Sequence, residues 1–156
     1  MTSVPDILAP IRKDEVDPDL LWRVSELLTR WRTDESGGRL EGFGPEVMEV
    51  ELDRPGIDAL RLALLGLVEP DLSHPHASTI VWLLGKWAYT EDQPLFRRAL
   101  ELGAEGADDL LYQALIALDN LEVLNAHTTS FSAFEVETNR ALAQAYLASE
   151  PSTPGS

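Results

Sequence analysis

The sequence predicts an all-α protein of stacked helical hairpins, either a solenoid of helix pairs or a compact multi-helix bundle. Two observations predict this class. Apolar residues recur every three or four positions through most of the chain, and Pro, Gly, Ser or Asp stands where each such pattern begins or ends. The chain has 156 residues, of which 44% are hydrophobic, so it can bury one ordinary core.

The first clear helix follows Asp17, a good N-cap, and Pro18, which suits the first helical position. Gly37-Gly38 ends this helix. Residues 1–16 contain two prolines and are expected to form an irregular lead-in. We expect a single α-helical domain over residues 17–150 and a disordered tail at residues 151–156.

The segment from Glu46 to Asp53 is ambiguous. Val50 and Leu52 alternate with acidic residues, as in a strand, but a short helix beginning at Pro45 fits equally well.

The remaining patterns are helical. Their expected ranges are residues 57–69, 77–89, 94–102 and 107–121, followed by a last helix that starts near Ser132 and ends before Pro151. The range 77–89 is apolar on nearly all sides, which indicates a central, buried helix.

Internal similarity favours the solenoid. The residues from Trp82 to Trp87 and those from Gln113 to Leu118 occupy equivalent places in successive helix pairs, and Leu64-Leu65-Gly66 is similar to Leu83-Leu84-Gly85. In this the segment from Ile57 to Leu124 resembles HEAT-like repeats. That resemblance implies an architecture and no functional residue.

Composition restricts the function. The net charge of −15 argues against direct binding to nucleic acid or to an anionic membrane, because both need clustered Lys and Arg. The chain has no cysteine, no apolar run long enough to cross a bilayer and no signal-peptide pattern near its start, so we expect a cytoplasmic protein.

One turn collects metal-ligand residue types. It contains Asp71, His74 and His76, and His127 is a conceivable fourth ligand. Neighbouring prolines favour an ordinary rigid turn instead, so we expect no metal and no other cofactor.

No nucleophile, phosphate-loop, dinucleotide or zinc-protease motif is present, and we expect a protein that is not an enzyme. Carboxylates do occur in pairs, Glu49 with Asp53 and Asp109 with Asp119. Their spacing is more typical of solvated helix faces than of an acid and a base in a cleft.

The most informative charge pattern lies between Arg98 and Arg140, where eight acidic residues occur without one Lys or Arg. Such one-signed charge favours steering of a cationic partner. Tyr112 stands among these acids and is either an interface anchor or a filler between helices. The predicted partner-binding residues are Glu101, Glu105, Asp108, Asp109, Tyr112, Asp119 and Glu122.

In type, a small, acidic, cysteine-free chain without catalytic motifs resembles the immunity proteins that neutralise bacterial toxins, often cationic nucleases. This resemblance implies an inhibitor that binds a basic protein, with charge complementarity speeding association. An alternative is an adaptor whose repeat groove holds a peptide or a helix. A metal-dependent enzyme using Asp71, His74 and His76 is the third hypothesis.

Overall fold

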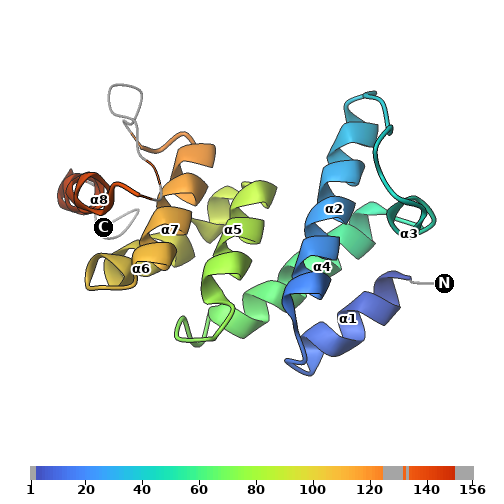
Figure 1. The fold of residues 1–156 in the computed structure, drawn as a ribbon, viewed down its shortest axis with the longest axis horizontal. Helices are drawn as coiled ribbons and strands as arrows, with labels where there is room; N and C mark the ends of the chain where they lie inside the picture. The colour runs from blue at the N-terminus through green and yellow to red at the C-terminus, as the bar shows by residue number, and fades with distance from the viewer. Residues whose placement is uncertain (1–2, 125–131, 133, 150–156) are drawn as a thin grey trace. The chain divides into compact units, whose positions relative to one another are not determined.

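The structure is a computed structural model that describes residues 3–124, 132 and 134–149. Eight α-helices and one 3₁₀ turn make up its regular structure, and the described residues contain no strand (Figure 1). The predicted all-α class is confirmed. Contacts divide the chain into two compact units, unit 1 from Met1 to Asp71 and unit 2 from Leu72 to Ser156. The domain limits expected at residues 17 and 150 stay predictions.

Unit 1 contains α1 (Val4–Arg12), α2 (Pro18–Glu35), α3 (Pro45–Met48) and α4 (Arg54–Val68). Asp17 caps α2 as predicted, because its carboxylate accepts a hydrogen bond of 2.8 Å from the amide of Leu20. The ambiguous segment after Gly44 begins as the short helix α3 and continues without a strand.

The irregular structure expected for residues 1–16 is wrong for most of that segment. Ser3 and Asp6 form a capping box, and Pro5 lies in the first turn, where a missing N–H costs nothing. The apolar side of α1 is buried and α1 packs on α4, so tertiary contact stabilises a helix that its prolines seemed to forbid. Its buried residues are Val4, Ile7, Leu8 and Ile11.

Unit 2 contains α5 (Ala77–Trp87), the 3₁₀ turn η1 (Thr90–Asp92), α6 (Gln93–Ala104), α7 (Asp108–Asn120) and α8 (Val136–Ser149). Helix α7 packs against α5, α6 and α8. The apolar helix expected at residues 77–89 is buried on several sides, as predicted. The tail expected at residues 151–156 lies outside the described residues.

Small residues set the spacing of these helices. A β-carbon on Gly85 would lie 2.9 Å from the β-carbon of Ala117, so α5 and α7 approach closely there. The side-chain amide of Asn120 also donates a hydrogen bond of 3.2 Å to the carbonyl of Gly85. These contacts fix the face of α7 that is turned inward, and therefore the face that is left exposed.

Candidate partner-binding surface

The structure separates the predicted binding residues into two groups. The first, here called the turn group, consists of Glu101, Glu105, Asp108 and Asp109, at the end of α6 and the start of α7. The second, the end group, consists of Asp119 and Glu122. An α-helix rises about 1.5 Å per residue, so the two groups lie roughly 16 Å apart along α7.

Two arginines from outside the acidic stretch pair with the turn group. Nε of Arg97 lies 3.5 Å from a carboxylate oxygen of Glu101, and Nη2 of Arg140 lies 3.2 Å from Oδ1 of Asp108. Arg140 also lies 3.4 Å from Glu137. The expectation of an acidic stretch without balancing charge is therefore wrong for Glu101 and Asp108. Both arginines flank the stretch in sequence: Arg97 pairs with Glu101 one turn along α6, and the packing of α8 on α7 brings Arg140 to Asp108.

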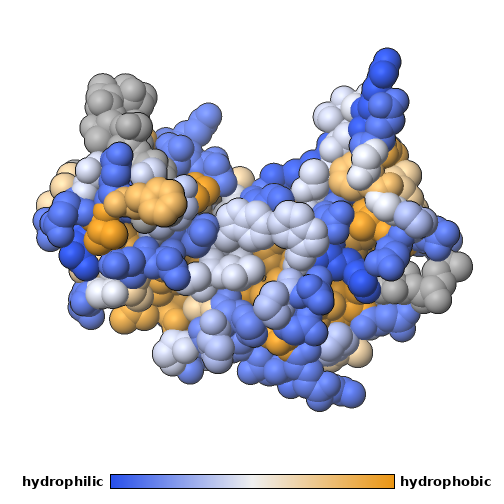
Figure 2. Space-filling model, viewed as in Figure 1, coloured by the Kyte–Doolittle hydropathy of each residue, from blue (hydrophilic) through white to orange (hydrophobic). Residues whose placement is uncertain are grey.

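The other four acidic residues, Glu105, Asp109, Asp119 and Glu122, are exposed. Within the described part of the chain, no Lys or Arg forms an ion pair with any of them. On the face in view, hydrophilic residues around α6, α7 and α8 surround small hydrophobic areas (Figure 2). The exposed acidic residues of unit 2 therefore belong to a surface that also has apolar areas.

Helix electrostatics distinguishes the two groups. Asp108 and Asp109 lie in the first turn of α7, where the helix dipole stabilises negative charge. The end group lies at the opposite pole, where negative charge is disfavoured and α7 offers no basic residue in its last turn. Glu122 also has a φ of 60°, a left-handed conformation that glycine or asparagine adopts more readily. Folding therefore explains the first-turn aspartates better than it explains the end group.

Tyr112 is partly buried on α7, one turn after Asp108, so only part of its ring is open to a partner. The aromatic with the better-defined role is Tyr146 on α8. Its hydroxyl accepts a hydrogen bond of 3.0 Å from Gln93, and the guanidinium of Arg97 lies 5.7 Å from its ring centroid. Tyr146 thus helps to hold α8 on α6.

The histidine turn has a local explanation. The backbone N–H of His76 donates a hydrogen bond of 3.0 Å to Nδ1 of His74, and the two ring centroids lie 5.9 Å apart. Among the described residues, no three His, Asp or Glu side chains lie close enough together to share a metal ion. His127 lies outside the described residues.

The carboxylates noted as pairs in the sequence, Glu49 with Asp53 and Asp109 with Asp119, are explained by their positions on the helices. Asp53 caps α4 by accepting a hydrogen bond of 2.7 Å from the amide of Gly56. Asp109 and Asp119 stand near opposite ends of α7, too far apart to act together on one bond.

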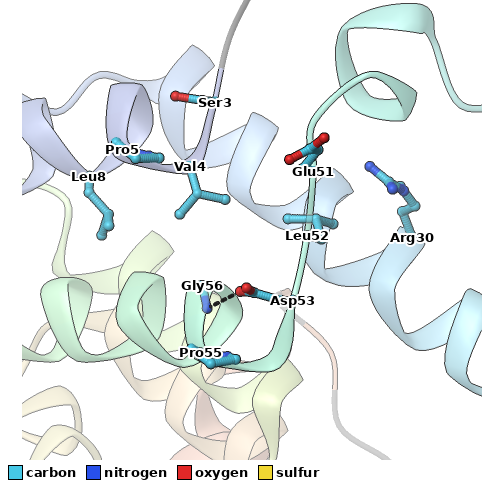
Figure 3. A pocket seen from close by; sticks show the side chains of 10 residues that line it. All are labelled: Ser3, Val4, Pro5, Leu8, Arg30, Glu51, Leu52, Asp53, Pro55 and Gly56. Carbon is cyan, nitrogen blue, oxygen red and sulfur yellow. Dashed lines mark hydrogen bonds between the residues drawn. The ribbon is translucent and has the colours of Figure 1, made fainter.

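A hollow of about 790 Å³ lies in unit 1 between the starts of α1 and α4, and Arg30 of α2 stands in its wall (Figure 3). One guanidinium nitrogen of Arg30 donates to the carbonyls of Val47 and Val50, at 2.7 and 2.6 Å. Arg30 therefore stabilises the turn after α3. The ionisable groups beside it in the wall, Glu51 and Asp53, are acidic.

A second hollow of about 460 Å³ lies in unit 2, beside the turn group. Its wall contains Leu72, His74, Leu102, Glu105 and Leu110, and Leu102 is 40% exposed. We call it the Leu102 hollow. It was missed from the sequence, although one signal was present: the end of α6 and the connection to α7 contain four small residues, Gly103, Ala104, Gly106 and Ala107.

No helix among the described residues is both long and apolar enough to span a membrane. Comparison with protein-family models, with curated proteins and with solved structures finds no match to this chain.

Proposed function

We propose that this protein is a non-catalytic inhibitor that binds a basic protein through the acidic surface of unit 2, in the manner of an immunity protein that neutralises a toxin. The turn group and the end group supply the carboxylates. A cationic nuclease is the class of toxin that such a surface suits best, because its active site must attract phosphate and would be covered by carboxylates.

The observation that carries the proposal is the end group. Asp119 and Glu122 are exposed acids at the C-terminal pole of α7, and Glu122 has left-handed backbone. Each feature costs folding free energy, on the order of 0.3–1 kcal/mol for a charge placed against the helix dipole. Solubility alone does not require acidic residues at the C-terminal end of α7. Binding of a basic partner at this end accounts for them.

A second candidate is an adaptor that holds a peptide or a helix in a groove, and the Leu102 hollow favours it because it is partly apolar and open. A HEAT-like stack of helical hairpins would supply the groove that such an adaptor needs. Close packing of α5 on α7 and of α6 on α7 supports stacked hairpins. The equivalence of Trp82–Trp87 in α5 with Gln113–Leu118 in α7 is the sequence feature that supports repeats.

The test is a binding and inhibition experiment with the purified product of the adjacent reading frame. An inhibitor should form a stoichiometric complex with it, abolish its activity, and associate more slowly as salt is raised. A complex without loss of activity would favour the adaptor. Absence of any complex with a basic toxin-like neighbour would contradict the inhibitor.

A further inference from the structure

We propose that the Leu102 hollow receives one apolar side chain of the partner, and that the partner carries Lys or Arg on both sides of that side chain. This inference rests on the proposed function and specifies its partner: a short basic segment with an apolar anchor. The inference places the apolar anchor on the partner and its receiving site on this chain, whereas the sequence indicated Tyr112 of this chain as a candidate anchor.

The apolar part of the inference comes from Leu102. The other large apolar side chains of α6, Leu95, Phe96 and Leu100, are almost fully buried, whereas Leu102 is 40% exposed and forms one wall of the hollow. Leu110 lies across from it and is 4% exposed, so the apolar surface continues inward. A volume of 460 Å³ falls within the range of about 300–1,000 Å³ that is usual for small-ligand sites.

The basic part comes from the acids beside the hollow. Glu105 lines it, and Asp109 follows two residues after Ala107, another lining residue. Both acids are exposed and, among the described residues, lack a basic partner. Asp108, between them, is paired with Arg140 of α8 at 3.2 Å. This ion pair shows that a guanidinium fits against the turn group, and a partner cation can bind there in the same way at Asp109 or Glu105.

The connection between α6 and α7 keeps the hollow open. Gly103 is at the helix contact, and a β-carbon there would lie 2.5 Å from the amide nitrogen of Leu111. Gly106 has a φ of 152°, a backbone conformation that side-chain-bearing residues rarely adopt. Gly103 thus lets α6 and α7 meet beside the hollow, and Gly106, which lines it, holds a backbone conformation that keeps a side chain out of that position.

The experiment uses two synthetic peptides as probes, acetyl-Lys-Lys-Trp-Lys-Lys-amide and the same peptide with Ala in place of Trp. Each is titrated into the full-length ¹⁵N-labelled protein at low salt, and amide shifts report affinity and location. We expect the Trp peptide to bind about tenfold more tightly, because it buries an aromatic side chain. Shifts should concentrate at Leu102, Ala107 and Leu110.

Leu102→Asn should abolish the preference for the Trp peptide. Leu62→Asn is the matched control, because Leu62 is an exposed leucine of α4, 59% exposed, and should leave the preference unchanged. Ala107→Leu is the second variant. It adds volume at the exposed N-cap of α7 and should weaken binding of the Trp peptide but not of the Ala peptide. This variant tests binding at the hollow if Leu102→Asn fails to fold.

The outcomes separate this inference from the proposed function. One outcome is that both peptides bind equally and that salt and the double variant Glu105→Gln with Asp109→Asn weaken binding, whereas Leu102→Asn does not. This result would overturn binding at the hollow and would keep binding at the acidic surface. Binding that ignores salt and both acid substitutions would overturn the acidic turn group. No binding of either peptide would overturn the hollow and the acidic turn group together.

Discussion

Gly103 of α6 and Leu111 of α7 bring the two helix backbones into direct contact, because a β-carbon on Gly103 would lie 2.5 Å from the amide nitrogen and 2.6 Å from the α-carbon of Leu111. The obstructing atoms are backbone and cannot turn aside. Gly103→Ala should therefore force α6 and α7 apart and lower the free energy of unfolding by about 3 kcal/mol. Urea unfolding followed by circular dichroism measures the change.

Gly66→Ala is the matched control. Gly66 lies within α4, and a β-carbon there would meet nothing within 4 Å. Alanine is the better helix former, so this variant should gain about 0.5–1 kcal/mol. Equal effects of the two substitutions would show that α6 and α7 do not approach as closely as described.

The N-cap of α2 gives a second prediction. Asp17→Ala removes the acceptor of the hydrogen bond from Leu20 and should destabilise the protein by about 1 kcal/mol. Glu15→Ala, at an exposed position two residues earlier, should change the midpoint of thermal unfolding little. Equal shifts of the two midpoints would argue against the cap.

Asp6 predicts a pH effect at α1. Hydrogen bonds from the side chain and then the backbone of Ser3 lower the pKa of Asp6. A lowered carboxylate pKa adds stability that is complete above the ordinary aspartate value of about 3.9 and is lost as pH falls through the folded-state pKa. Ser3→Ala should raise the pKa of Asp6, as followed by NMR titration of its side-chain carboxyl. An unchanged pKa would mean that the Ser3 hydroxyl does not donate to the carboxylate.

Arg140 predicts a gain in binding. It pairs with Asp108 and Glu137, so Arg140→Gln should release a carboxylate of the turn group and speed association with a basic partner. Loss of such partly exposed pairs should cost less than about 1 kcal/mol of stability. Arg39→Gln is the control, because it removes the same charge from unit 1, where Arg39 pairs with Glu41. Equal acceleration by both variants would indicate a net-charge effect with no role for Asp108.

The sequence predicted the elements whose start or burial is determined by residues close together in the chain. Asp17 and Pro18 located the start of α2, and the wholly apolar pattern of α5 predicted its burial. Helix α1 was missed because burial against α4 outweighs its two prolines.

Prediction of the site was limited by long-range contacts. The last helix was expected to start near Ser132, yet α8 begins at Val136, and Phe134 before it is 95% exposed. The i,i+4 pair of Arg97 with Glu101 was readable from the sequence and was overlooked, whereas the pairing of Arg140 with Asp108 depends on how α8 packs on α7. The Leu102 hollow depends on how α5, α6 and the small-residue turn meet, which no single segment encodes.

The measurement that tests the acidic surface most directly is the association rate of the double variant Asp109→Lys and Asp119→Lys with the purified product of the adjacent reading frame, at low and at physiological salt. One substitution removes a favourable charge from the start of α7 and the other removes an unfavourable one from its end, so folding should change little. The control, Asp34→Lys with Glu49→Lys, makes the same change of charge at exposed positions in unit 1. We predict that the double variant associates about tenfold more slowly at low salt and loses most of its salt dependence, while the control stays close to wild type. Equal rates for wild type and both variants would contradict a partner-binding role for the acidic surface.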